Sequence, residues 1–243
     1  MMKRFYSILA ALVLTFAAAG ASASNVSAQT KKAARAGSRV SAPLNLAVLI
    51  QDDLVSRVGN ELRETGDFIR TLPAGSRVMV GYIRSGSLQV RQPFTEDLEA
   101  AARSLRIPVG STAASPFNPY LQVRDALKMF PEGGANRSAL LLVSDGLDVS
   151  RGFDFSSSVD SIDLNRAVRE AKNRGVSVYS FYAPSAGLTS WDSRAVSFGQ
   201  SALNRVSDET GGRAFFQGTD FVTFNAYFSR LTKTLNEQGG RAY

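Results

Sequence analysis

Two nearly continuous apolar segments of this chain each end abruptly in polar, acidic residues. Residues 44–50 lead into Gln51–Asp53, and residues 139–143 lead into Ser144–Gly146. A short, unbroken apolar segment of this kind is typical of a parallel strand that is buried on both faces. We therefore predict two buried strands whose carboxyl ends open into acidic loops.

Helical and extended patterns alternate along the rest of the chain. Apolar residues recur at helical spacing over 58–72, and a turn at Ser85–Gly86 joins 77–84 and 88–91 into a hairpin with an antiparallel edge strand. The other predicted elements are helices over 95–105 (N-cap Thr95), 120–130, 162–174, 196–209 and 221–236, and strands over 176–182 and 213–216. This alternation predicts an α/β domain with a mostly parallel sheet, helices on both faces, and functional loops at the carboxyl ends of the strands.

The amino-terminal end of the chain has the composition of an export signal. Basic residues precede an apolar stretch over 5–19, and small residues follow it at 21–23. The pattern predicts a signal peptide over 1–23, with cleavage as late as residue 28 or an uncleaved anchor as alternatives. We expect an exported protein that is periplasmic or extracellular.

A linker separates this signal from the predicted domain. Residues 24–42 are basic and lack aromatic side chains, which is typical of a disordered linker. A single domain is predicted over 43–243. No later segment approaches the length of about 20 apolar residues that spans a bilayer, so we expect no transmembrane span in the mature chain.

The net charge is concentrated outside the predicted domain. The formal charge is +7 and the sequence pI is near 9.9, but six basic residues and no acidic residue precede Ser41. The rest of the chain is therefore near neutral. Because a nucleic-acid groove needs several cations on one face, we predict no nucleic-acid partner.

The chain contains no His and no Cys, which removes many kinds of catalytic and metal site. Imidazole bases, thiolate nucleophiles, zinc sites built on His or Cys, and disulfides are all excluded. Carboxylates and hydroxyls remain, and they favour hard cations such as Mg²⁺, Ca²⁺ or Mn²⁺. The candidate ligands at the predicted loops are Asp52, Asp53, Ser56, Thr112 and Asp145. The alternative is that these residues cap helices and shape turns.

Several motifs in a fixed order resemble the von Willebrand factor type A (VWA) domain, and more narrowly its divergent secreted VWFA-related branch of acidobacterial type. They are Leu46–Ile50 with the acidic turn, Gly59–Leu62, Leu72–Tyr82, Gln92–Thr95, Ser144–Gly146, Gly175–Ser180 and Thr210–Phe215. The resemblance covers about residues 42–240. It implies a Rossmann-like sheet of about six strands and a metal-ion-dependent adhesion site (MIDAS), where an Asp-x-Ser-x-Ser loop, a Thr and a second Asp hold Mg²⁺ for a partner's carboxylate.

This sequence departs from that ligand pattern in the first loop. Asp145 matches the second Asp, and Thr112 is the match for the Thr. In one register the first loop reads Gln51, Asp53, Val55, and in the other it reads Asp52, Leu54, Ser56. Each register loses at least one ligand, so the resemblance implies a degenerate site with at most weak Mg²⁺ or Ca²⁺ binding.

We predict a non-catalytic module that binds a protein or envelope macromolecule at the loops 51–56, 110–115 and 145–154. Four aromatic residues on predicted loops or strand ends are candidates for the partner surface, or alternatively cover the core beneath long loops: Phe153, Tyr182, Trp191 and Phe198.

The alternative function is a metal-dependent phosphotransfer enzyme or phosphatase-type hydrolase that uses Asp52, Asp53 and Asp145. The acids fit the Asp-x-Asp pattern of such phosphatases poorly, and the sequence has no P-loop, Gly-x-Ser-x-Gly or Gly-x-Gly-x-x-Gly motif. The pattern favours recognition over catalysis. It does not indicate an oligomeric state.

Overall fold

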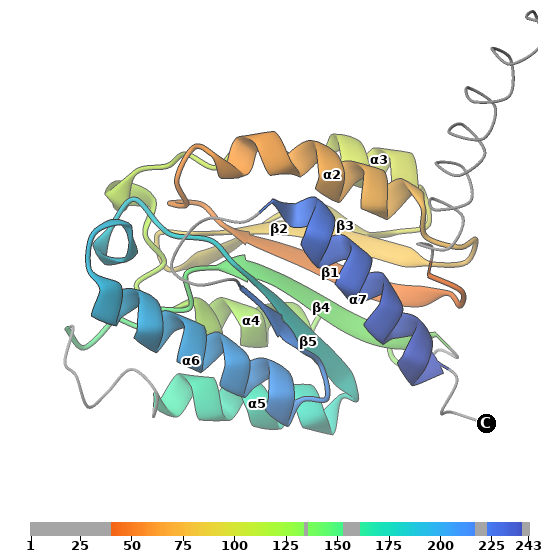
Figure 1. Ribbon diagram of the computed structural model, residues 1–243. Helices are drawn as coiled ribbons and strands as arrows, with labels where there is room; N and C mark the ends of the chain where they lie inside the picture. Colours follow the sequence, from red (N-terminus) through yellow and green to blue (C-terminus); the bar gives the residue numbers. More distant parts are fainter. Residues whose placement is uncertain (1–39, 134–135, 153–160, 217–222, 240–243) are drawn as a thin grey trace, which may run out of the picture. The chain divides into compact units, whose positions relative to one another are not determined.

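The computed structural model describes residues 40–133, 136–152, 161–216 and 223–239 (Figure 1). The predicted signal peptide, nearly all of the predicted linker, and Phe153 lie outside these residues. The packed region begins slightly before the predicted boundary at residue 43. Val40 is 3% exposed, and the backbone N–H of Ser41 donates to Asn236 Oδ1 at 2.9 Å.

The central sheet has six strands in the order β3-β2-β1-β4-β5-β6. All neighbouring strands are parallel except β2 and β3, which form the antiparallel hairpin at one edge. The predicted sheet is therefore confirmed. The strands are β1 (Leu44–Gln51), β2 (Arg77–Arg84), β3 (Ser87–Thr95), β4 (Arg137–Ser144), β5 (Val176–Tyr182) and β6 (Ala214–Phe215).

Helices cover both faces of the sheet (Figure 1). On one face lie α2 (Val58–Arg70), α3 (Leu98–Arg103) and α7 (Phe224–Gly239). On the other lie α4 (Pro119–Leu127), α5 (Ile162–Asn173) and α6 (Ser193–Glu209). Two 3₁₀ turns, η1 (Thr112–Ala114) and η2 (Leu188–Ser190), belong to loops. Within the described residues, none of the helices has the length and apolar character needed to cross a bilayer.

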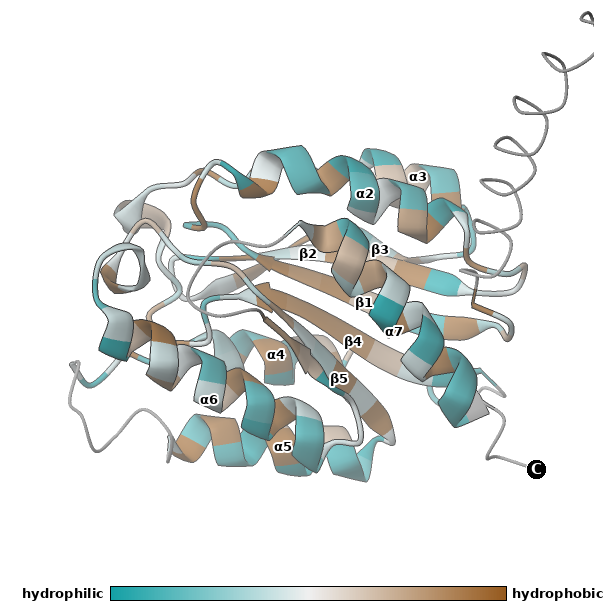
Figure 2. Cartoon of the chain, in the orientation of Figure 1, coloured by the Kyte–Doolittle hydropathy of each residue, from teal (hydrophilic) through white to brown (hydrophobic). Residues whose placement is uncertain are grey.

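The two buried strands form the centre of two hydrophobic layers. Every residue of β1 is buried, and its alternating side chains enter opposite layers, for example Leu46 and Val48 on the α7 side and Ala47 and Leu49 on the α4 side. Figure 2 shows the hydrophobic strands enclosed by helices whose outer faces are hydrophilic. Because both faces of β1 are covered, its sequence is continuously apolar rather than alternating.

The start of α3 differs from the prediction. Thr95, the predicted N-cap, still belongs to β3, where it is the partner of Val78 on β2. Asp97 is the N-cap instead, and its Oδ1 accepts from the backbone N–H of Ala100 at 2.8 Å. Thr95 Oγ1 accepts from the N–H of Asp97, so both residues stabilise the turn between strand and helix.

The strand order reverses between β1 and β4, which makes this the topological switch point of the sheet. From β1 the chain proceeds to β2 and β3 on one side, and it later returns to β4 on the other side of β1. Ile50 and Val143 are register partners, so the acidic loops behind them lie side by side. This confirms the predicted meeting of the two strand ends, at the point in an open α/β sheet where ligands usually bind.

Candidate functional site at the tips of β1 and β4

A buried, hydrogen-bonded cluster surrounds the side chain of Gln51. Its Nε2 donates to Asp53 Oδ1 at 2.7 Å and to Asp145 Oδ1 at 3.0 Å, so one amide group links two carboxylates. Its Oε1 accepts from Ser144 Oγ at 2.5 Å and from the backbone N–H of Asp145 at 3.3 Å. Gln51, Asp53 and Asp145 are 1%, 2% and 5% exposed. We call Asp53 and Asp145 the carboxylate pair.

The loop after β5 closes over the carboxylate pair. Thr189 Oγ1 donates to Asp145 Oδ2 at 3.2 Å, and Thr189 also contacts Ser185. The backbone N–H of Ala186 donates to the carbonyl oxygen of Asp53 at 2.8 Å. Loops from three neighbouring strands are thus connected around the pair. Ser185 and Thr189 are not among the predicted site residues, and their polar side chains behind a strand were the available signal.

The electrostatics of the pair follow from its burial. Burial, followed by the negative charge of Asp145, raises the pKa of the Asp53 carboxyl to about 7, and hydrogen bonds from Gln51 and Ser115 oppose this rise. Burial also raises the pKa of Asp145, against hydrogen bonds that include one from Ser185. Near neutral pH the pair therefore carries less than two full negative charges.

Asp52 points away from the pair and forms a partly buried ion pair with Arg106. The guanidinium Nη1 and Nη2 donate to the two carboxylate oxygens at 2.6 and 2.9 Å, a bidentate arrangement. The backbone N–H of Val109 also donates to Asp52, at 3.1 Å. The Tyr82 ring lies 4.0 Å from the guanidinium, and its hydroxyl donates to the Arg106 carbonyl. Asp52 therefore attaches the loop after α3 to the sheet.

The remaining two candidate ligands lie apart from the pair. Ser56 and Thr112 are exposed, and in the described part of the chain neither side chain hydrogen-bonds to Asp53 or Asp145. Ser115, in the same loop as Thr112, approaches Asp53 instead. The structure thus brings together Asp53 and Asp145, places Asp52 on the opposite side of β1, and leaves Ser56 and Thr112 on the surface.

Comparison with known proteins identifies the fold. No protein-family model matches the sequence, and no curated protein matches it. Among solved structures, the aerotolerance-related membrane protein of Bacteroides fragilis NCTC 9343 aligns with a TM-score of 0.55 over 80% of this chain and 99% of its own, at 12% identity. BatB of Bacteroides thetaiotaomicron aligns with a TM-score of 0.53 over 81% and 99%, at 10% identity.

A third structure is that of proximal thread matrix protein 1 from the mussel byssus, which has a zinc-occupied MIDAS motif. Its TM-score is 0.51 at 12% identity, and the alignment covers 83% of this chain and 49% of the mussel protein. This chain has the fold of a divergent VWA domain. At these identities the likeness concerns the VWA fold alone.

The geometry agrees with one of the two registers for the first VWA loop. Gln51 and Asp53 face Asp145, whereas Asp52 does not, so the loop register begins at Gln51. These residues do not fit the ion of a VWA adhesion site, because an amide nitrogen already occupies the position between the carboxylates. Among the described residues there is also no group of three or more Asp, Glu, His or Cys side chains arranged to hold a metal.

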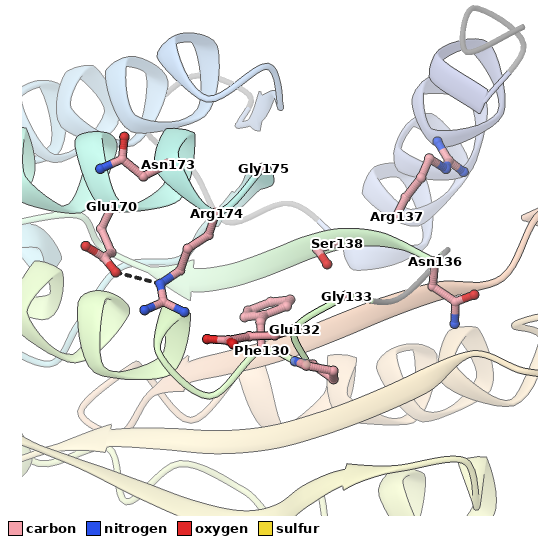
Figure 3. A pocket seen from close by; sticks show the side chains of 11 residues that line it. Phe130, Glu132, Gly133, Asn136, Arg137, Ser138, Glu170, Asn173, Arg174 and Gly175 are labelled. Carbon is pink, nitrogen blue, oxygen red and sulfur yellow. Dashed lines mark hydrogen bonds and ion pairs between the residues drawn. The ribbon is translucent and has the colours of Figure 1, made fainter.

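A separate hollow of about 590 Å³ lies at the opposite end of the sheet, beside the amino ends of β4 and β5 (Figure 3). Glu170 and Arg174 pair across its wall with an O–N distance of 2.5 Å. Arg137 points toward α7, where its Nη1 donates to the carbonyl oxygen of Leu235 at 2.7 Å. This hollow has no connection with the carboxylate pair.

The arrangement at the strand tips does not favour phosphotransfer. A nucleophilic Asp53 would have to reach a phosphate group, but its side chain is 2% exposed and hydrogen-bonded to Gln51. Asp52 is fixed by Arg106. The cluster is better suited to holding three loops in one conformation than to reacting with a substrate.

Proposed function

We propose that this chain is an exported interaction module, which binds a protein partner through the loops at the carboxyl end of its sheet and turns over no substrate. Export rests on the signal-like pattern of residues 1–23. The adhesion site of the VWA fold is degenerate in this proposal, and the binding surface is the outer face of the loops rather than an ion.

The observation that carries the proposal is a concentration of exposed apolar side chains at this end. Seven large hydrophobic side chains are exposed in the described part of the chain, and only Met129 lies at the other end of the sheet. The other six lie on loops or first helical turns at the carboxyl end: Ile107, Val109, Phe117, Leu121, Ile162 and Trp191. We call the four loop residues Ile107, Val109, Phe117 and Trp191 the apolar rim.

Trp191 and Phe117 are the strongest anchors in this rim. Trp191 is 72% exposed and Phe117 is 56% exposed, and aromatic side chains dominate the energetics of protein interfaces. Phe117 also has a φ of +58°, a backbone conformation that bulky residues rarely adopt. Its carbonyl oxygen accepts from the N–H of Val149 at 2.7 Å, which fixes this strained conformation. Such strain tends to occur at functional sites.

Two of the aromatic residues predicted for a partner surface are placed differently. Tyr182 is 1% exposed and belongs to the core, as the alternative prediction held. Phe198 is half-buried on α6. Of the three predicted aromatic residues that the structure describes, Trp191 faces solvent most fully.

The proposal is tested by capturing a partner from an envelope extract with the purified protein as bait. We expect a Phe117→Ala/Trp191→Ala double variant to lose the partner, because truncation of each aromatic anchor that the partner would cover weakens binding by at least about tenfold. Met129→Ala is the matched control, since Met129 is 46% exposed at the other end of the sheet. Equal recovery of every bound protein by all three baits would show that the rim is not the binding surface.

A further inference from the structure

The hydrogen bonds of Gln51 fix the orientation of its amide. The Oε1 atom faces an N–H donor, the backbone of Asp145, and Nε2 faces two carboxylate oxygens that can only accept while ionised. The flipped amide would place an oxygen against both carboxylates and an NH₂ group against the backbone N–H. Chemistry therefore assigns the nitrogen to the space between Asp53 and Asp145.

That nitrogen stands where a cation between the carboxylates would stand. It lies 2.7 Å from Asp53 Oδ1 and 3.0 Å from Asp145 Oδ1, and an amide nitrogen carries two hydrogens, one for each carboxylate. A Mg²⁺ ion would need the same two oxygens at about 2.0–2.1 Å, and Ca²⁺ would need them at about 2.3–2.6 Å. Neither ion fits without displacement of the amide.

Other groups of the protein occupy further hydrogen-bond acceptor positions of Asp145. Asp145 Oδ1 accepts a second bond from the backbone N–H of Leu147 at 3.1 Å, and Oδ2 accepts from Thr189. Displacement of the amide would leave Ser144 Oγ and the Asp145 N–H without the acceptor they share. A buried donor that loses its partner costs about 1–3 kcal/mol.

We infer that the amide of Gln51 takes the place of the divalent cation at the tips of β1 and β4. An internal, uncharged hydrogen-bond donor connects the two carboxylates, so the loops are held in position without a metal. Replacement of this one side chain by a third carboxylate converts the cluster into a divalent-cation site. The inference stands on the geometry of Gln51 and does not depend on the proposed partner.

The test combines calorimetry and thermal unfolding with MgCl₂, MnCl₂ and CaCl₂ as the probes. For the wild type we expect no saturable heat with a dissociation constant at or below about 10⁻³ M, the weak limit of protein Ca²⁺ sites, and no change of the unfolding temperature with EDTA. In EDTA we expect Gln51→Asp to unfold at a lower temperature than the wild type. Millimolar Mn²⁺ or Mg²⁺ should raise the unfolding temperature of this variant.

Two controls make the result specific. Gln51→Ala removes the amide and adds no carboxylate, so it is destabilised but gains nothing from metal. Asp145→Ala in the Gln51→Asp background abolishes the metal-dependent rise. Saturable Mg²⁺ or Ca²⁺ binding by the wild type that Asp145→Ala removes would overturn the inference. The inference would also be overturned if none of the three ions changed the folding or the unfolding temperature of the Gln51→Asp variant.

The metal measurements and the capture of a partner can fail independently, so they distinguish this inference from the proposed function. If the apolar rim binds a partner, capture by the wild type continues in EDTA. A failure to capture any partner leaves the metal measurements unaffected, and metal binding by the wild type leaves the comparison of rim variants unaffected.

Discussion

Three consecutive polar residues at the end of β1 have three different roles. Gln51 is the last residue of β1, and Asp52 and Asp53 follow it in a turn. The turn places Gln51 and Asp53 beside Asp145, whereas Asp52 pairs with Arg106. The sequence alone left open which residue aligns with the start of the VWA loop motif, since two adjacent acids satisfy either alignment. The conformation of this turn is fixed in part by the backbone of β2, where the Asp52 N–H donates to the carbonyl oxygen of Ile83 at 2.9 Å.

The raised pKa of Asp53 predicts a pH-dependent stability that Asp53→Asn removes. The folded pKa of about 7 lies above the ordinary value of about 3.9, so the folded state binds more protons between these values. The free energy of unfolding therefore falls as pH rises from about 4 to about 7, with a contribution from Asp53 of at most about 1.4 kcal/mol per pH unit.

Asparagine keeps an acceptor for Gln51 and carries no charge at any pH. We expect Asp53→Asn to be more stable than the wild type at pH 8 and of similar stability at pH 4, measured by urea unfolding across this range. The difference between the two proteins removes the contribution of titrating groups that do not interact with Asp53. Because the charge of Asp145 contributes to the raised pKa of Asp53, the difference reports the carboxylate pair. Two stability curves that run parallel over the whole range would contradict the prediction.

At the scale of elements, two glycines bring α6 into backbone contact with the turn after β4. A Cβ atom on Gly199 would lie 1.9 Å from the carbonyl oxygen of Asp145, and one on Gly146 would lie 2.4 Å from the carbonyl oxygen of Gly199. Gly146 also has a φ of +75°. This close approach fixes the turn that carries Asp145 into the site.

Gly199→Ala is predicted to destabilise the domain, although alanine is the better helix former by about 1 kcal/mol. The added methyl group must push α6 away from β4, at a cost of about 1–3 kcal/mol for overpacking. Ser197→Ala, at an exposed position of the same helix, is the control and should change stability by less than about 0.5 kcal/mol. Thermal unfolding of both variants measures this. A Gly199→Ala variant as stable as the control would mean that α6 tolerates the shift.

The site residues that the sequence did not predict correctly lie on loops rather than at strand ends. Asp53 and Asp145 follow buried strands, so their meeting was predictable from the apolar pattern. Thr112 lies on the surface and Ser115 approaches Asp53, because the conformation of a long loop depends on contacts that no local pattern encodes. Ser185 and Thr189 reach the pair through the bridge between Leu54 and Ser185, which joins residues far apart in the sequence.

At the scale of the whole molecule, the alternation of apolar runs and amphipathic segments was enough to predict the fold. The continuous apolar strands 44–50 and 139–143 required helices on both sides, and the structure has them. The start of the packed region was less predictable, because Val40 is a single apolar residue within a polar stretch. Its burial becomes evident only from its place in the core beneath α7.

Val40 leads to a prediction about where a stable domain begins. A chain that starts at Arg39 should unfold at a higher temperature than one that starts at Pro43. Burial of a valine side chain contributes about 2 kcal/mol, which corresponds to about 4–8 °C for a domain of this size. Val40→Ser in the longer chain should lose most of this difference. Equal unfolding temperatures for all three proteins would show that Val40 contributes nothing.

The hydrogen bond between Ser41 and Asn236 has a consequence for how the protein meets its surroundings. It places the point where the chain enters the domain beside the last turns of its final helix, at the amino end of the sheet. Trp191 and Phe117 lie at the far end. A domain tethered to a surface or to another protein through either terminus would therefore hold these aromatic rings outward, away from its point of attachment and toward whatever approaches it.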